Sequence, residues 1–237
     1  MTGPTRRSAL RRKRERGSYD RETIYAILDE ALICHVGFGD GESVFVVPTI
    51  HARVGDLLYL HGAAANHMLE RLGSGAELCV TVTLVDGLVF ARSAFHHSVN
   101  YRSVMVFGTA STVVDPEEKR AAVLAIVDHV AKGRTADARP PSEIELRATT
   151  VVRVPLGEAS AKTRTGPPIE ESEDLDLRIW AGEVPLETRA MEPVPAPGLP
   201  EEVEVPSYVR WYPQRQVGPP DAGAGSRRHQ SRPAPGG

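Results

Sequence analysis

The sequence predicts a mainly β fold with flanking helices, arranged as an antiparallel barrel. Apolar segments of strand composition follow one another through short turn signals. Gly55-Asp56 separates two of them, and Asp86-Gly87, the strongest hairpin signal in the chain, separates two others. The strands do not alternate with helices, as they would in a parallel sheet. Neither a GxGxxG nor a GxxxxGKS/T motif occurs, so neither nucleotide-binding fingerprint is available.

Strand composition is found in seven segments, which are residues 33–39, 44–54, 57–62, 78–85, 88–95, 103–114 and 149–156. A first helix begins at Ser18 or Asp20, because either side chain can cap it. A short helix is predicted over 63–72. Pro116 opens a longer helix over 117–132, since proline is favoured at the first helical position.

Two terminal segments differ in composition from the ordered domain, which we place at residues 18–186. Residues 1–17 are rich in arginine and poor in large apolar side chains, which predicts a disordered basic tail. We interpret this tail as a solvated leader rather than a nucleic-acid-binding arm. Residues 187–237 are expected to form a Pro-rich, largely disordered extension. Within it, the aromatic stretch 206–212 is expected to dock on the core or on a partner.

The bulk composition narrows the functional classes. A net charge of -3 and a pI near 6.3 give no field that favours nucleic acid or membrane. No apolar run is long enough for a membrane span, and no secretory signal is expected. Cys34 and Cys79 lie outside any CxxC pair, so neither a zinc site nor a disulfide framework is indicated. This cysteine usage is typical of a reducing cytoplasm.

Polar residues interrupt two apolar segments in a way that suggests binding. Pro48 and Thr49 lie inside an apolar strand, and a proline there marks an edge or a bulge. His61-Gly62 ends a strand just before a helix, whose N-terminus is a natural phosphate cradle that Asn66 and His67 extend. The alternative is that these histidines are ordinary rim and surface residues.

A third polar group occupies residues 91–104. Arginines suit a phosphate group, and hydroxyl and amide groups add further donors. The residues concerned are Arg92, Ser93, Asn100, Tyr101, Arg102 and Ser103. The adjacent His96 and His97 would point to opposite faces of a strand and have no acidic or thiol ligand at suitable spacing, so we predict no metal site.

The fourth group is the segment 160–168, where Lys162 and Arg164 precede Gly166 and two prolines. It is either an anion-binding loop or a solvated basic turn. No GxSxG elbow, HExxH motif or paired catalytic cysteine occurs. Donors outnumber acids and bases in these segments, which suits an anionic cofactor that performs the chemistry itself.

Three blocks of this sequence resemble the pyridoxamine 5'-phosphate oxidase-like FMN-binding split-barrel superfamily. They are LDEALICHVGFGDGESVFVVPTIHARVGDLLYLHGAAANHMLERL, TLVDGLVFARSAFHHSVNYRSVMVFG, and ASAKTRTGPP with IWAGEVPL. Within it, the sequence is most similar to the branch of nitroimidazole-resistance proteins. The resemblance covers residues 18–186 and implies a six-stranded Greek-key split barrel and a homodimer with FMN at the subunit interface.

The resemblance also implies roles for individual residues. Segment 46–49 would lie along the isoalloxazine ring, segment 101–104 would reach the flavin of the partner subunit, and His61 would act beside the flavin as the catalytic residue. Asn66-His67 stands where pyridoxamine-phosphate oxidases carry a phosphate-binding lysine or arginine. The residues expected to hold the cofactor are Val47, Pro48, Thr49, His61, Gly62, Asn66, His67, Arg92, Ser93, Asn100, Tyr101, Arg102, Ser103, Lys162 and Arg164.

We therefore expect a cytoplasmic FMN-dependent oxidoreductase that transfers hydride or electrons to a small molecule such as a nitroaromatic or a quinone. The C-terminal signature of true pyridoxamine-phosphate oxidases is not recognisable, so vitamin B6 oxidation is not expected. One alternative is an F420- or FAD-dependent reductase of the same fold. Another is a non-catalytic haem- or flavin-binding module with His61, His96 or His97 as the axial ligand.

Overall fold

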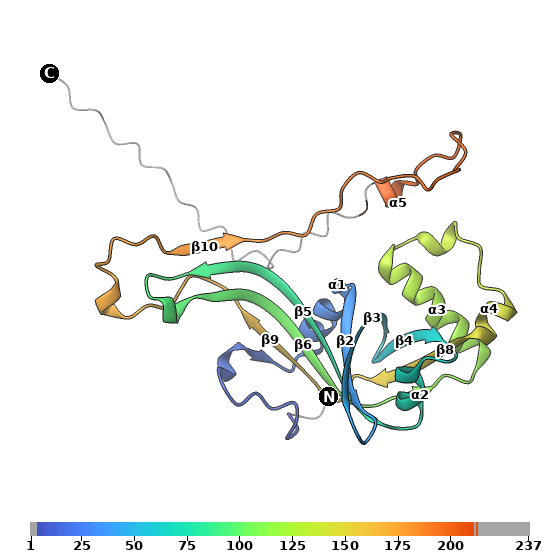
Figure 1. The fold of residues 1–237 in the computed structure, drawn as a ribbon, viewed down its shortest axis with the longest axis horizontal. Coiled ribbons are helices and arrows are strands. Elements are labelled where there is room, and N and C mark those ends of the chain that lie inside the picture. The colour runs from blue at the N-terminus through green and yellow to red at the C-terminus, as the bar shows by residue number, and fades with distance from the viewer. Residues whose placement is uncertain (1–3, 211, 213–237) are drawn as a thin grey trace.

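The computed structural model describes residues 4–210 and 212, which form one mixed β and α domain with extended segments at both ends (Figure 1). Ten strands form a sheet in the order β1-β9-β6-β5-β2-β3-β4-β8-β7, and β10 pairs with β5; every pairing is antiparallel. The strands are β1 (Gly17–Ser18), β2 (Ile33–Gly39), β3 (Val44–Val54), β4 (Leu57–Ala63), β5 (Glu77–Phe90), β6 (Ser98–Thr109), β7 (Ser111–Thr112), β8 (Thr149–Pro155), β9 (Ala159–Arg164) and β10 (Gly182–Pro185).

The described residues form five α-helices, of which the first four begin at side chains that cap them. They are α1 (Arg21–Glu30), α2 (His67–Gly73), α3 (Pro116–Val130), α4 (Glu143–Ala148) and α5 (Ser207–Arg210). Asp20, Asn66 and Asp115 each accept hydrogen bonds from the first-turn N–H groups of the helix that follows. None of the helices in residues 4–210 is both long and apolar enough to cross a membrane.

The sheet curls into a barrel, and β8 and β9, which lie next to its two short edge strands β7 and β1, are consecutive in the chain. Side chains from facing strands fill the interior, and the set includes Val36, Leu58, Val80, Val106 and Val154, none of which is exposed. Helix α1 packs against this core, while α3 covers a second cluster on the outside of β3, β4 and β8. The predicted class, a mainly β antiparallel barrel with flanking helices, is confirmed.

The hairpin predicted at Asp86-Gly87 is wrong, because β5 runs straight through these residues. The pairing of β5 with β6 only shifts register there, between Val85 and Gly87. Asp86 is buried and accepts two hydrogen bonds from Arg102 on β6, and the backbone of Val184 on β10 approaches Gly87 closely. These long-range partners hold an extended bulge where local preference favours a turn.

The structure also moves other predicted boundaries. The polar segment 91–104 is not one loop, since β6 already begins at Ser98, and the segment 160–168 contains most of β9 rather than a turn. The predicted strand 103–114 ends at Thr109 and continues as the short β7. The basic turn of 160–168 became a strand because Tyr101 to Val106 on β6 pair with it.

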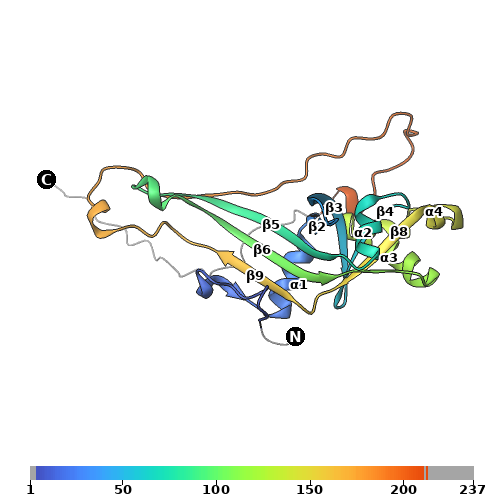
Figure 2. The ribbon, with the colours of Figure 1, turned by 60° about the horizontal axis from the view of Figure 1, so that its bottom comes forward.

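The distal ends of β5 and β6 project beyond the barrel and form an arm with β10 (Figures 1 and 2). We call residues 87–100 and 165–185 the arm. Several large apolar side chains on it are exposed, and Phe95 and Trp180 are the largest of them. Trp180 packs on Phe90 at 5.8 Å between ring centroids, so it lies on the arm and not in the barrel core.

The two terminal segments lie along the barrel in their described parts. Residues 4–17, expected to be a disordered tail, are held by hydrogen bonds of Thr5 and Arg7 to Glu158. After the arm, residues 186–206 form an extended strap, and the following residues dock at the end of α3, where Arg134 donates to the Tyr208 hydroxyl at 3.0 Å. The disorder predicted for 213–237 lies outside the described residues.

A buried histidine pair predicts a pH-dependent stability. His51 is fully buried, its Nε2 lies 3.0 Å from the carbonyl oxygen of Leu28, and its ring lies 4.8 Å from that of His129. Burial, aided by the nearby His129, lowers the pKa of His51 from 6.5 to about 4. In the unfolded chain this histidine binds a proton at higher pH, so stability is lost as pH falls from about 6.5 towards 4.

We expect the free energy of unfolding to fall by about 3 kcal/mol across this window. Urea unfolding of the purified protein at several pH values measures it. The His51→Gln variant should lose most of this slope, whereas the control His35→Gln, at an exposed position, should keep it. An unchanged slope in His51→Gln would contradict the assignment.

Candidate functional site

The sheet presents a broad outer face on the side away from the barrel core. Cross-strand register places Val46, Gly37, Cys79 and Phe107 in one row of this face, and cross-strand neighbours point to the same side of a sheet. The next row contains Pro48, His35, Thr81 and Met105. Val46 is 65% exposed and Met105 40% exposed, so the outer face is an uncovered surface that is largely apolar.

Two features make the outer face flat and open at one edge. Gly37 carries no side chain, although a Cβ there would meet only ordinary contacts of 3.5 Å or more. Residues 44–50 of β3 pair with β2 on one side, and no strand of the described chain pairs with their other side. Pro48 therefore lies on an open strand edge, as predicted, and backbone groups of this edge are available to a ligand.

Strands β3 and β4 separate beside this edge. Their last paired residues are His51 and Leu60, and His61 is the first residue of β4 past the separation. His61 is half-buried, and its Nδ1 is buried with no hydrogen-bond partner among the described residues. Burial lowers the pKa of His61, which favours the neutral imidazole. Pro48 and Thr49 of β3 and His61 of β4 thus lie on the two sides of this opening in the strand pairing.

The start of α2 borders the same opening, but its donors are partly used. Asn66 accepts a hydrogen bond from the Leu69 N–H at 3.1 Å, and His67 packs against Phe45 with ring centroids 5.4 Å apart. A Cβ on Gly62 would lie 3.1 Å from the Leu69 side chain, so glycine permits the close crossing of α2 over β4. Asn66 and His67 therefore have structural roles here.

Strand alternation divides the predicted ring-binding segment. Val47 packs against the barrel core, and Thr49 lies opposite the buried Cys34. The side chains on the outer face are instead those of Val46 and Pro48. The sequence could have shown this, because side chains along a strand alternate between its two faces and neighbouring residues therefore point to opposite sides.

Three predicted phosphate-binding arginines are engaged by other residues. Arg102 forms bidentate contacts with both Asp86 and Glu30. Arg92 is paired with Glu170. These acids neutralise the guanidinium groups at short range, which removes much of their attraction for a phosphate.

Among the described residues, the hydrogen-bond partners of Arg164 are neutral. It donates to the Asn100 side chain and, at 2.8 and 3.0 Å, to the carbonyl oxygens of Gly166 and Pro167. Asn100 in turn donates to Glu183 of β10 at 2.6 Å. These contacts fasten the base of the arm, and Ser93 caps the short turn at the arm's tip.

Among the predicted phosphate-binding cations, Lys162 is the one whose charged group is least engaged by other described residues. It lies opposite both Gly17 and Ser103 in the sheet, and the Ser103 hydroxyl donates to its carbonyl oxygen at 3.2 Å. Within residues 4–210 and 212, its ammonium group has no ion pair. Tyr101 lies two residues before Ser103 on β6, so its side chain points to the same face of the sheet. This end of the outer face is therefore polar.

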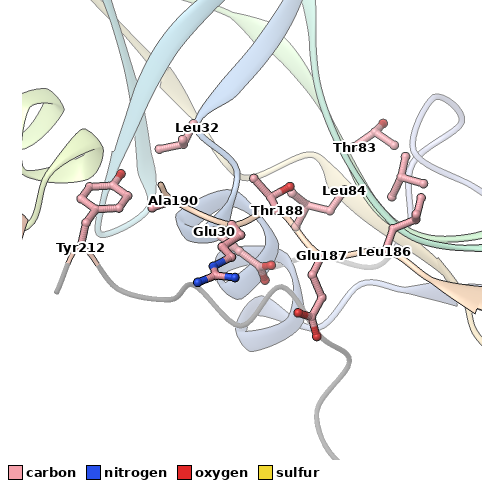
Figure 3. Close-up of a pocket in the computed structure, with 11 residues that line it drawn as sticks. Glu30, Leu32, Thr83, Leu84, Leu186, Glu187, Thr188, Ala190 and Tyr212 are labelled. Atoms are coloured by element: carbon pink, nitrogen blue, oxygen red, sulfur yellow. The ribbon is translucent and has the colours of Figure 1, made fainter. Parts of the chain in front are cut away.

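A cavity of about 660 Å³ adjoins the outer face where β2 leaves β5 (Figure 3). The end of α1 and β5 line it on the barrel side, and the strap lines it on the other. The lining residues are Glu30, Leu32, Thr83, Leu84, Val85, Leu186, Glu187, Thr188, Arg189, Ala190 and Tyr212. Sequence reasoning missed this cavity, because the strap reaches it only through tertiary contacts.

The structure thus sorts the predicted residues into three places. Pro48, Thr49, His61 and Gly62 surround the opening between β3 and β4. Tyr101, Ser103 and Lys162 lie at the other end of the outer face. Arg92 and Ser93 lie in the arm, which projects away from the barrel (Figures 1 and 2). No group of three metal-binding side chains occurs in the described part of the chain.

Comparison with known proteins agrees with this architecture. A family model described as pyridoxamine 5'-phosphate oxidase matches residues 20–163, which is more than half of the chain. The chain belongs to this family. Its fold is therefore the split barrel that the sequence blocks implied. No curated protein matches the chain.

Two solved structures are similar over nearly their whole length. The flavocytochrome Anf3 from Azotobacter vinelandii is 37% identical, with a TM-score of 0.82 over 87% of this chain and 96% of that one. A FAD and haem binding protein from Mycobacterium smegmatis is 35% identical, with a TM-score of 0.79 over 82% and 96%. A protein described as a 5-nitroimidazole antibiotic resistance protein, from Bacteroides thetaiotaomicron, is 29% identical, with a TM-score of 0.52 over 62% and 85%.

The ion cluster around Arg102 yields a stability prediction. Replacing Arg102 by Met should leave Asp86 and Glu30 without their partner and lower the free energy of unfolding by about 3–5 kcal/mol. The matched control Arg153→Met breaks the more exposed pair with Glu118 and should cost about 1 kcal/mol or less. Urea unfolding of both variants is the measurement. A normally stable Arg102→Met that lost only its cofactor would instead assign Arg102 to phosphate binding.

Proposed function

We propose that this protein is a flavin-dependent oxidoreductase that reduces a small oxidised molecule, such as a nitroaromatic or a quinone. The observation that carries the proposal is the outer face, a flat apolar surface beside an open strand edge and a half-buried neutral histidine. A planar heterocycle can stack on such a surface and hydrogen-bond to the free backbone groups. The deep cavity next to this face offers room for a second ligand.

FAD is favoured over FMN as the flavin. FMN is the cofactor that the sequence blocks implied, and the outer face suits the ring of either. The two similar structures at 35 and 37% identity are a FAD and haem binding protein and a flavocytochrome. They extend over far more of this chain than the nitroimidazole-resistance relative does. The larger share of the chain that these two structures cover supports FAD as the flavin of this protein.

The residues of the outer face fit the flavin in a defined way. Val46 and Pro48 would contact the ring, the edge of β3 would bind its polar rim, and Lys162 would neutralise the phosphate end. A bound flavin supplies hydride and single-electron transfer. His61, whose pKa is lowered by burial and whose buried Nδ1 has no hydrogen-bond partner among the described residues, would accept or hold a proton at Nδ1 near the open edge.

A homodimer would complete this site. The outer face and the arm leave large apolar side chains exposed, including Val46, Met105, Phe95 and Trp180, more than a stable monomer usually shows. A second copy seated on the outer face would cover them and bring arm residues such as Arg92 towards the flavin. Cys34 and Cys79 form no disulfide, which agrees with a cytoplasmic location.

The first test is the visible spectrum of the purified protein and the mass of the released chromophore. We expect an oxidised-flavin spectrum and release of FAD. Release of FMN or F420 would replace FAD in the proposal, and a colourless protein with no flavin affinity on titration would refute it.

A substitution tests where the flavin binds. Gly37→Trp should place a large ring across the outer face and raise the flavin Kd at least about tenfold, a loss of roughly 1.4 kcal/mol. The control Gly157→Trp adds the same side chain to an open turn and should leave the Kd unchanged. Light scattering on both variants separates loss of flavin from loss of the dimer. An unaltered Kd in Gly37→Trp would move the flavin elsewhere.

Haem is a second ligand that specific features favour. In the similar proteins it accompanies the flavin, as their names state. His97 places Nδ1 3.1 Å from the Ser93 carbonyl oxygen, which can only accept, so Nε2 is left unprotonated for a metal. His61 offers an unpartnered nitrogen in the same way. His96 is less suited, since its Nε2 faces Glu171 at 3.8 Å.

Haemin titration tests this second function. We expect a Soret band with the wild-type protein and its loss in either His61→Ala or His97→Ala, because removing an axial ligand weakens haem binding. The control His35→Ala should retain the band. Retention of the band in both variants would exclude these two histidines as ligands.

A further inference from the structure

The basic segment, residues 6–16, is folded against the barrel. Arg7 donates to both Glu158 and Glu77 and lies over the Phe107 ring, 5.7 Å from its centroid. The Ser8 side chain beside it is buried. Arg7 is thus the anchor of the segment, and its charge is neutralised by two acids.

The backbone of the segment is specifically shaped. Lys13 adopts φ 54° in the left-handed region, which is strained for a residue with a side chain. The Leu10 N–H donates to the Tyr19 hydroxyl at 3.0 Å, and the Leu10 side chain occupies the space where a Cβ of Gly17 would be, 2.1 Å away. The segment therefore forms a fixed loop that holds its side chains outwards.

The cations on this loop lack countercharges. Five of them are exposed and have no ion pair among the residues that the structure describes; they are Arg6, Arg11, Arg12, Lys13 and Arg14. The basic segment holds seven of the chain's 28 cationic side chains and only one of its 31 acidic ones. The remainder of the chain, with 21 cationic and 30 acidic side chains, is strongly acidic. An excess of cationic over acidic side chains is therefore concentrated in this one short loop.

The loop lies next to the outer face. Immediately after it, Gly17 pairs with Lys162 of β9, and Lys162 pairs with Ser103 of β6. Arg16 is close enough to Arg164 to act with burial in lowering its pKa. The unpaired cations thus border the surface on which the flavin is proposed to lie.

We propose that the basic segment is the docking surface for a small acidic electron-carrier protein, an inference that rests on the proposed flavin function. A small patch of free cations suits a brief electrostatic encounter with an acidic protein. The acidic remainder of the chain would repel an extended polyanion such as nucleic acid or an anionic membrane. In each encounter the reduced carrier is oxidised by one electron and the flavin takes it up. Two encounters supply the two electrons that the substrate consumes, with protons from solvent.

Charge reversal on the loop tests the proposal. The probe is a small acidic [2Fe–2S] ferredoxin, reduced beforehand, and stopped-flow absorbance gives the second-order rate constant for reduction of the bound flavin. The triple variant Arg11→Glu, Arg12→Glu, Arg14→Glu should lower this constant at least about tenfold at low ionic strength, and the difference should disappear in about 0.5 M salt. The triple variant with Gln at the same three positions removes the charges without reversing them, so its rate constant should lie between those of the wild-type protein and the Arg→Glu variant.

The control variant makes the same change of charge elsewhere, at the exposed residues Lys132, Arg147 and Arg210, and should retain the wild-type constant. Reduction by dithionite should be equal in all variants. Calorimetric titration with oxidised ferredoxin measures docking without any flavin step. If docking is normal and no flavin is present, the flavin function fails while the docking surface stands.

Three results would overturn the proposal. The first is an equal rate constant and equal ferredoxin affinity in the Arg→Glu variant and its control. The second is a change of oligomeric state by light scattering in the Arg→Glu variant, which would make the loop a subunit contact. The third is wild-type binding to anionic vesicles or to an oligonucleotide with no binding to ferredoxin.

Discussion

Arg102 reaches from β6 to carboxylates on two other elements, Asp86 at the β5 bulge and Glu30 at the end of α1. All three groups are largely removed from water, where an isolated charge is costly and a fully hydrogen-bonded set is tolerated. The cluster sits where β5 leaves the barrel and becomes part of the arm. It therefore fixes the position of α1 against the barrel, the bulge in β5, and the place where β10 joins.

Much of the barrel could be predicted from local sequence. Gly55 adopts positive φ in the predicted turn, and Asp20 and Pro116 mark two helix starts as predicted, whereas the short helix predicted from residue 63 begins only at His67, after the cap Asn66. The hairpin predicted at Asp86-Gly87 is wrong because Arg102, the residue that binds Asp86 within the extended strand, is 16 residues away in the sequence. The strap and β9 were missed for the same physical reason, since their conformations depend on strands or helices distant in sequence.

The residues of the candidate site also divide into those that local sequence could identify and those whose roles depend on distant partners. Pro48 and His61 could be singled out because a proline in a strand and a histidine before a helix are unusual locally. The arginines could be recognised as a polar group, but their acidic partners come from Glu30, Asp86 and Glu170, which no spacing rule connects to them. Folding the chain turned several expected phosphate ligands into structural ion pairs.

The strap crosses the large cavity and is fastened at both ends, by β10 on one side and by Tyr208 and Tyr212 on the other. Both attachments join residues far apart in sequence; the Tyr212 hydroxyl bonds to Val130, 82 residues earlier. Closing such a long loop costs conformational entropy, and exposed segments with few buried contacts open at low free energy. Local release of the strap would therefore expose the lining of the cavity while the barrel stays folded, so access to the cavity depends on the local stability of the strap rather than on the stability of the whole domain.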